Sequence, residues 1–228
     1  MFDAVLFDMD GLLLDSERVL MQAWTAAAAE EGITIPHEVY TAVIGRAAQE
    51  SHQLFTDMLG GAERHARLRT KVVERLHARR EGPVFPLKPG VVELLGALRA
   101  RGVPCAVASS SGADDLEPMP DLVGVLHHFD AVAGGNEVPR GKPDPAVYAL
   151  AASRLGIPAA ACIAFEDSEN GARAALAAGA TLVVVPDLRR PADEVMTRCL
   201  HELASLHDAQ EHLPRWFPDR FLLESAQS

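Results

Sequence analysis

Carboxylate, hydroxyl and amine side chains follow the apolar runs of this sequence in four short segments. Asp8 and Asp10 come directly after the apolar run at residues 4–7. The other segments contain the serines at 109–111, Lys142, and the pair Glu166 and Asp167. Ligands of an open parallel sheet bind at the carboxyl ends of its strands, so we expect these groups to meet. Four converging carboxylates repel one another unless a cation lies between them, and Mg²⁺ takes oxygen ligands, which favours a Mg²⁺ site.

Each segment alone also has an ordinary structural explanation. Asp8-Met9-Asp10-Gly11 has the composition of a turn, and Lys142 resembles solvated surface lysines. Glu166-Asp167 could cap a helix with an acidic first turn. Two known ligand motifs do not fit. Gly11 stands too early for an EF-hand loop, and Gly141-Lys142 lacks the first glycine and the hydroxyl of a phosphate-binding loop.

The spacing of apolar residues predicts the elements that position these groups. A helix is predicted from Ser16, which would cap it, to Gly32, and only helical patterning continues to about residue 82. Further on, predicted helices at 91–101, 145–155 and 171–178 alternate with predicted strands at 104–108, 130–132, 162–165 and 181–185. This alternation is typical of an α/β fold, a Rossmann-like doubly wound parallel sheet, here with an inserted all-helical cap.

These patterns predict two domains. Residues 1–14 and 83–228 are expected to form the Rossmann-like core domain, and residues 15–82 the helical cap domain. The tail after about residue 191, with Trp216-Phe217-Pro218, has no readable pattern.

The composition excludes several classes of protein. Of the 228 residues, 48% are hydrophobic and 23% charged, as in globular proteins. A formal net charge of −11 offers no basic patch for nucleic acid or an anionic membrane. The chain lacks both a run of about 20 apolar residues and a basic N-terminus, so we expect a cytoplasmic protein. Cys105, Cys162 and Cys199 are odd in number and far apart, which predicts buried reduced thiols.

Taken together, the four segments resemble the four ordered motifs of the haloacid dehalogenase-like (HAD) hydrolase superfamily. The motifs here are Asp8-Met9-Asp10-Gly11-Leu12-Leu13-Leu14-Asp15-Ser16, then Ser109, then Gly141-Lys142-Pro143-Asp144-Pro145, then Glu166-Asp167-Ser168. The resemblance extends to about Pro191 and includes a cap after the first motif, as in the subgroup of sugar-phosphate phosphatases and β-phosphoglucomutase. It implies a Mg²⁺-dependent phosphatase that hydrolyses a small phosphate monoester, such as a sugar phosphate, through an aspartyl-phosphate. The default assembly for this cap type is a monomer.

The resemblance also implies a role for each motif residue. Asp8 would attack phosphorus, and a carboxylate needs no base to do so. Asp10 would protonate the leaving oxygen and then activate water. Three residues would bind phosphoryl oxygens: Ser109, Ser110 and Lys142. Four would bind Mg²⁺: Asp8, Asp10 through its backbone carbonyl, Asp167, and Glu166 directly or through water.

Other members of the superfamily fit the sequence less well. Dehalogenases and phosphonatases lack the second aspartate, which is Asp10 here. β-Phosphoglucomutase carries a histidine where this chain has Leu20, and a basic pair where it has Ile44 and Ala48. Those groups position a sugar bisphosphate for return transfer, so their absence favours hydrolysis, with the mutase as the alternative. Arg46, at a predicted joint between cap helices, is the candidate substrate-binding residue, against the reading of a solvated surface arginine.

Two further functions remain as alternatives. Ala108-Ser109-Ser110-Ser111-Gly112 imitates the nucleophile turn of α/β-hydrolases, with histidines downstream at 201, 207 and 212. A serine esterase of that type leaves Asp8, Asp10 and Lys142 unexplained. A catalytically silent scaffold is disfavoured because every motif carries a competent residue. The expected partner is therefore a small-molecule phosphate ester, not a nucleic acid or a membrane.

Overall fold

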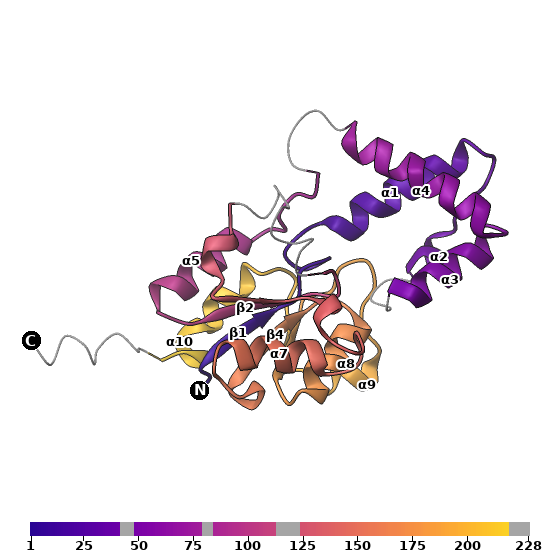
Figure 1. The fold of residues 1–228 in the computed structure, drawn as a ribbon. Coiled ribbons are helices and arrows are strands. Elements are labelled where there is room, and N and C mark those ends of the chain that lie inside the picture. The colour runs from indigo at the N-terminus through magenta and orange to yellow at the C-terminus, as the bar shows by residue number, and fades with distance from the viewer. Residues whose placement is uncertain (42–47, 79–83, 113–123, 219–228) are drawn as a thin grey trace, which may run out of the picture.

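A six-stranded parallel sheet forms the centre of the molecule (Figure 1). The computed structural model describes residues 1–41, 48–78, 84–112 and 124–218. The strands are β1 (Ala4–Phe7), β2 (Cys105–Ala108), β3 (Ala131–Ala133), β4 (Cys162–Glu166), β5 (Thr181–Val184) and β6 (His201–Glu202). Their order is β3-β2-β1-β4-β5-β6, and each neighbouring pair is parallel. The predicted α/β fold with a doubly wound parallel sheet is confirmed.

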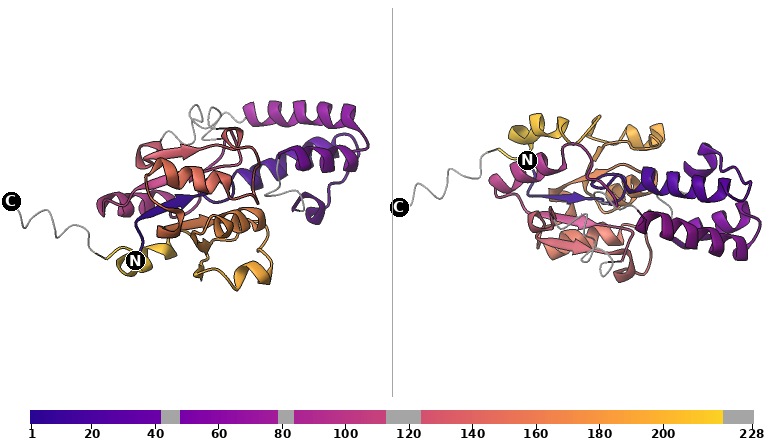
Figure 2. Two further views of the ribbon diagram at one scale, coloured as in Figure 1. Left: turned by 60° about the horizontal axis from the view of Figure 1, so that its bottom comes forward. Right: turned by 90° about the horizontal axis from the view of Figure 1, so that it is seen from above.

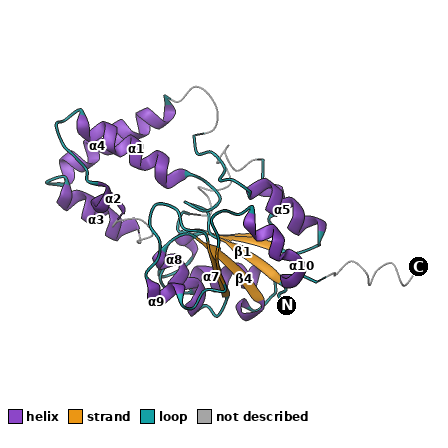
Figure 3. Cartoon of the chain, turned by 180° about the vertical axis from the view of Figure 1, so that it is seen from behind, coloured by secondary structure: helices purple, strands orange, loops and turns teal. Residues whose placement is uncertain are grey.

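Helices cover both faces of the sheet because the side chains of β1 alternate between two cores. Val5 and Phe7 belong to one buried cluster, with α5 (Val91–Ala100) and α10 (Leu213–Trp216). Ala4 and Leu6 belong to the other, with α7 (Ala146–Arg154) and α8 (Glu169–Ala177). The strands lie between these two groups of helices (Figure 3). Short 3-10 turns flank two of the strands: η1 (Leu126–His128) precedes β3, η2 (Gly135–Glu137) follows it, and η3 (Ala159–Ala161) precedes β4.

β1 lies where the strand order reverses. β2 and β3 are on one side of it, and β4, β5 and β6 on the other. Open α/β sheets bind ligands beyond the carboxyl ends of the strands at such a point. Asp8, which directly follows β1, is therefore placed where a ligand is expected.

The helices that the structure describes between β1 and α5 form a separate body (Figure 2): α1 (Ser16–Ala29), α2 (His37–Thr41), α3 (Ala48–Met58) and α4 (Ala62–His77). They have a core of their own, to which Tyr40 and Leu68 belong. Within it Trp24 stacks on Phe55, with ring centroids 4.9 Å apart. The division into a core domain at 1–14 and 83–228 and a cap at 15–82 stays a prediction, and its second boundary falls among residues 79–83, outside the described residues.

The chain passes between sheet and cap twice, and the two passages are hydrogen-bonded to each other. The Asp15 amide donates to the Pro86 carbonyl at 2.8 Å, and the Lys88 amide donates to the Leu13 carbonyl at 2.9 Å. Leu14 also forms an antiparallel bridge with Leu87. We call residues 11–15 and 85–88 the crossing segments. Together they form a short two-stranded connection between the sheet and the cap.

The tail, for which the sequence showed no pattern, packs on both faces of the sheet and adds its edge strand. It contains α9 (Asp193–Met196), β6, η4 (Asp208–His212) and α10. Trp216 is 2% exposed, and its ring lies against Phe165 with centroids 6.0 Å apart. The Trp216 carbonyl accepts a hydrogen bond from the Phe2 amide at 3.0 Å. Elements this short show no periodicity, which is why the sequence did not predict them.

The three cysteines are free thiols. Cys105 and Cys162 are buried as predicted, whereas Cys199 is only half-buried because it follows the short helix α9 near the edge strand β6. Within the described ranges, no helix has the length and apolar character needed to cross a membrane.

Gly90 should be required for stability, whereas Gly96 should not. Gly90 precedes α5 with a φ of 90°, and a Cβ there would lie 2.2 Å from the backbone nitrogen of His207. Gly96 lies inside α5, and a Cβ there would meet no heavy atom within 4 Å. We expect Gly90→Ala to lower the free energy of unfolding in urea by about 2 kcal/mol or more. Gly96→Ala should leave it unchanged or raise it by up to about 1 kcal/mol. Equal effects of the two substitutions would contradict this account of Gly90.

Candidate active site

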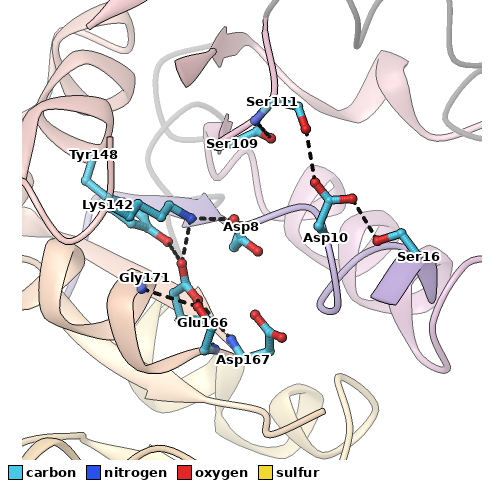
Figure 4. A network of polar contacts seen from close by, with 11 residues as sticks. Asp8, Asp10, Ser16, Ser109, Ser111, Lys142, Tyr148, Glu166, Asp167 and Gly171 are labelled. Atoms are coloured by element: carbon cyan, nitrogen blue, oxygen red, sulfur yellow. Dashed lines mark hydrogen bonds and ion pairs between the residues drawn. The ribbon is translucent and has the colours of Figure 1, made fainter. Parts of the chain in front are cut away.

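The four polar segments meet at the carboxyl edge of the sheet (Figure 4). Five of the predicted site residues are buried there: Asp8 (6% exposed), Ser109 (0%), Lys142 (4%), Glu166 (0%) and Asp167 (3%). Asp10 lies beside them, half-buried. Ser110 is exposed, and Arg46 lies outside the described residues. Burying so many charged groups is costly unless they are paired, so their contacts decide what the site can do.

Lys142 holds the centre of the site together. Its ammonium donates to Asp8 Oδ1 and, at 2.6 Å, to Glu166 Oε1. The ammonium also lies 4.9 Å from the centre of the Tyr148 ring. Burial alone would lower the pKa of Lys142, but the two carboxylates outweigh burial and hold that pKa above its ordinary value. Lys142 is therefore a permanent buried positive charge.

Glu166 has both carboxylate oxygens occupied by donors. Oε1 accepts from Lys142 and, at 2.7 Å, from the Tyr148 hydroxyl. Oε2 accepts from the backbone amides of Asp167 at 3.1 Å and Ser168 at 3.2 Å, and from the Ser168 hydroxyl at 3.1 Å. A carboxylate with this many donors is fixed in place. Glu166 thus anchors Lys142 and the start of α8.

Asp10 is held by hydroxyl groups. Ser16 Oγ donates to its Oδ1 at 2.7 Å, and Ser111 Oγ donates to its Oδ2 at 3.2 Å. Burial raises the pKa of Asp10 and outweighs these hydrogen bonds and the charge of Lys142, which lower it. The prediction that Ser16 caps its helix was wrong. Asp15 occupies the N-cap position without a side-chain cap bond, because the Ser16 hydroxyl is engaged by Asp10.

The serines after β2 have three different environments. Ser109 Oγ accepts a hydrogen bond from the Ser111 amide at 3.0 Å, which leaves its hydroxyl hydrogen available to a ligand. Ser111 contacts Asp10, as described above. The backbone of Ser110 is pressed against Gly135, where a Cβ would lie 2.2 Å from the Ser110 carbonyl oxygen. The run is therefore fixed against the neighbouring loop.

Asp167 provides an oxygen that no protein donor uses. Its Oδ1 is buried and has no hydrogen-bond partner in the described part of the chain. Burial, followed by the nearby Glu166 and Asp8 carboxylates, raises the pKa of Asp167 well above its ordinary value. Gly11, with a φ of 84°, is needed beside it because a Cβ there would lie 2.3 Å from Asp167 Oδ2. Such an oxygen fits a cation ligand better than a structural hydrogen bond.

Negative charge exceeds positive charge in this cluster. Asp8, Glu166 and Asp167 each have a carboxylate oxygen that lies within 4.8 Å of the other two. The Lys142 ammonium contacts Asp8 and Glu166. Burial and the Glu166 carboxylate raise the pKa of Asp8 to about 7, although Lys142 opposes the shift. A divalent cation bound between Asp8 and Asp167 would remove this excess, and the oxygen donor set suits Mg²⁺.

Two residues of the site, Tyr148 and Glu17, were not predicted from sequence, and Ser111 was expected only as a member of its serine run. Tyr148 and Ser111 contact Glu166 and Asp10, and Glu17 lies on the first turn of α1. Burial raises the pKa of Glu17 to about 8, with the charges of Asp10, Asp187 and Asp8 adding to the shift. The serine run predicted the place of Ser111 but not its contact with Asp10, whereas Tyr148 lies in an apolar helical pattern that indicates only core.

Comparison with known proteins agrees with this geometry. A family model for haloacid dehalogenase-like hydrolases matches residues 2–179. Hexitol phosphatase B of Escherichia coli K12 is 34% identical over 191 residues, covering 80% of this chain and 83% of that protein.

Solved structures share the fold over nearly the whole chain. A HAD family hydrolase from Deinococcus radiodurans R1, with bound phosphate and sodium, has a TM-score of 0.75 at 29% identity, covering 96% of this chain and 98% of its own. CbbY from Rhodobacter sphaeroides, in complex with phosphate, has a TM-score of 0.72 at 27% identity, covering 92% and 96%. The family match and the related phosphatase together show that this chain belongs to the haloacid dehalogenase-like hydrolase family and is a phosphoric monoester hydrolase.

Proposed function

We propose that the chain hydrolyses a small phosphate monoester, such as a sugar phosphate, with Asp8 as nucleophile and Asp10 as general acid and base. The observation that carries the proposal is that these neighbouring carboxylates are held differently. Asp8 is bound by an ammonium, and Asp10 by two neutral hydroxyls. The Lys142 ammonium opposes the rise in the pKa of Asp8 that burial causes and so favours its attacking, ionised form. Burial raises the pKa of Asp10, against the hydrogen bonds from the two hydroxyls, which suits a group that carries a proton.

In the first step an oxygen of Asp8 attacks phosphorus. The new bond joins Asp8 to the phosphoryl group, and the bond between phosphorus and the ester oxygen breaks. Asp10 gives its proton to the departing oxygen, so that the alcohol leaves neutral. The hydroxyls of Ser16 and Ser111 support this step because they fix the orientation of the Asp10 carboxyl.

In the second step water attacks the same phosphorus atom. Asp10, now ionised, takes a proton from the water. The bond between phosphorus and Asp8 breaks, which releases inorganic phosphate and restores the Asp8 carboxylate. The same group thus serves as acid and then as base, and each cycle returns it to its starting state.

Lys142 and Ser109 are placed to bind the transferring phosphoryl group. Lys142 carries a buried positive charge next to Asp8, and the Ser109 hydroxyl has a hydrogen to donate. Donors fixed before the reaction stabilise charge where it develops. Ser110 is exposed beside them and stays a predicted contact, as does Arg46 in the cap.

Mg²⁺ is the cofactor that fits the carboxylate cluster. Asp8, Asp167 and the backbone carbonyl of Asp10 would hold it, and the unpartnered Oδ1 of Asp167 supports this assignment. When bound, the ion supplies positive charge that lets the carboxylates and the phosphoryl oxygens approach. Protein donors already occupy both carboxylate oxygens of Glu166. Glu166 would therefore contribute to the metal site through a water molecule or by holding Lys142.

Hydrolysis is favoured over the mutase reaction. A mutase needs polar cap groups that hold the far phosphate of a sugar bisphosphate, yet Leu20 packs against the cap core. Ile44 lies outside the described residues, and Ala48 is apolar. The serine esterase alternative finds no support in the hydrogen bonds of Ser109, which involve no histidine within the ranges that the structure covers.

Asp8→Asn should abolish phosphate release. The amide cannot attack phosphorus and is a poorer cation ligand, so we expect a loss of about 10³-fold or more. The measurement is inorganic phosphate released from a panel of sugar phosphates with Mg²⁺. Chelation of the metal should stop the wild-type reaction. Chelator-resistant turnover would support an esterase, and substantial activity of Asp8→Asn would contradict the aspartyl-phosphate mechanism.

Asp10→Asn should lower turnover by about 10²–10⁴-fold without loss of Mg²⁺ binding. The expected metal contact of Asp10 is its backbone carbonyl, which the substitution keeps. Ser111→Ala is the matched milder variant, because it removes one hydrogen bond and should cost only about fivefold. Calorimetry with Mg²⁺ and phosphate release report the two properties separately. Loss of metal binding in Asp10→Asn would contradict this division of labour.

The product distinguishes phosphatase from mutase. With β-glucose 1-phosphate and a bisphosphate primer, we expect inorganic phosphate and no efficient formation of glucose 6-phosphate. A coupled assay for glucose 6-phosphate and a phosphate assay on the same sample measure both products. An excess of glucose 6-phosphate over released phosphate would establish the mutase.

A further inference from the structure

The loop after β5 joins the core to the cap. Asp187, whose side chain is 2% exposed, accepts from Lys88 at 2.5 Å and from Arg18 at 2.8 Å. Lys88 lies in a crossing segment, and Arg18 lies on the first turn of α1. The next residue, Leu188, packs against the hydrophobic core of the cap. The loop is therefore fixed to both parts of the molecule.

Arg189 follows on this loop and lines a cavity of about 40 Å³. The cavity is also lined by Thr41 at the end of α2 and by Asp167 of the candidate metal site. Arg189 is exposed and has no hydrogen bond or ion pair to any residue that the structure describes. The cavity thus has an unpaired arginine in its lining at the boundary between cap and core, together with Asp167 of the candidate metal site.

The next residue along the loop, Arg190, differs from Arg189 because its guanidinium is fully paired. Arg190 lines the same cavity, but its guanidinium is bound to Glu202 at 2.8 and 3.0 Å and to Asp193 at 2.8 Å. Just beyond it, the Ala192 amide donates to Glu169 Oε2 at 2.6 Å. Asp187 before Arg189 and the Ala192 amide after it hold the Arg189 backbone in place. Its planar array of donors suits a carboxylate or a phosphate group.

We infer that Arg189 is a specificity-determining residue that binds a second anionic group on the leaving part of the substrate. The inference rests on the proposed function, since a phosphoryl group at Asp8 and Lys142 leaves the remainder of the ester to extend toward the cap. The preferred substrates are then phosphate monoesters that carry a further carboxylate or phosphate. Arg189 offsets the repulsion between that group and Asp167, which lines the same cavity.

A matched pair of substrates tests this inference. Gluconate 6-phosphate carries a carboxylate where sorbitol 6-phosphate carries a CH₂OH group. We expect the wild type to have the higher kcat/KM for gluconate 6-phosphate. Arg189→Gln should lower the ratio of the two kcat/KM values by about tenfold or more, mainly through KM, because it removes a charge-assisted contact. Arg189→Lys should keep part of the preference.

Arg190→Gln is the control, because it removes the same charge from the adjacent, engaged guanidinium. In this variant the ratio of the two kcat/KM values should stay within about twofold of the wild-type ratio. A wild type without preference, or an equal change of the ratio in Arg189→Gln and Arg190→Gln, would overturn the inference.

Failure of the proposed function has a separate signature. A wild type that releases phosphate from neither ester nor from p-nitrophenyl phosphate would contradict the phosphatase. Calorimetry of the two intact esters with the same proteins would then decide the inference about Arg189. Weaker binding of gluconate 6-phosphate by about tenfold in Arg189→Gln alone would support it, and unchanged binding would overturn it.

Discussion

The buried ammonium of Lys142 is the interaction on which the site depends. It joins the end of β1, through Asp8, to the end of β4, through Glu166, and Tyr148 of α7 completes the contact. Removing one partner of such a buried pair leaves an uncompensated charge, which typically costs about 3–5 kcal/mol. The Lys142 ammonium thus stabilises the packing of the strand ends and also provides the positive charge of the site. It also explains how a chain with a net charge of −11 can bind an anionic ligand, because a buried charge is far less screened than those on the surface.

Two carboxylates of one short segment obtain different properties from their partners. Asp8 faces Lys142, whereas Asp10 faces the hydroxyls of Ser16 and Ser111. Side chains two residues apart in an extended segment share one side, so both can face the same ligand. In the mechanism that we propose, these different partners separate the group that attacks from the group that transfers a proton, although both residues are aspartates in nearly the same place.

Much of the fold and of the site could be predicted from the sequence, for physical reasons. Strand ends of a parallel sheet share one edge, so polar residues after successive apolar runs had to converge, as Asp8 and Lys142 do. Tyr148 could not be predicted because a buried hydroxyl on an apolar helix looks like core in sequence. The contact of Ser16 with Asp10 and the freedom of Arg189 depend on tertiary distances that no local pattern encodes. The tail was unreadable because its elements are too short for periodicity.

The paired crossing segments have a mechanical consequence. Gly11 to Asp15 lead directly from Asp10 into the cap, and they are hydrogen-bonded to the returning chain at Pro86 and Lys88. Ser16, the first residue of α1, belongs to the cap yet donates to the Asp10 carboxylate. A rotation of the cap about these segments therefore shifts the hydroxyl that orients the proton carrier. In the mechanism that we propose, the position of the cap and the alignment of Asp10 are therefore linked through this one hydroxyl.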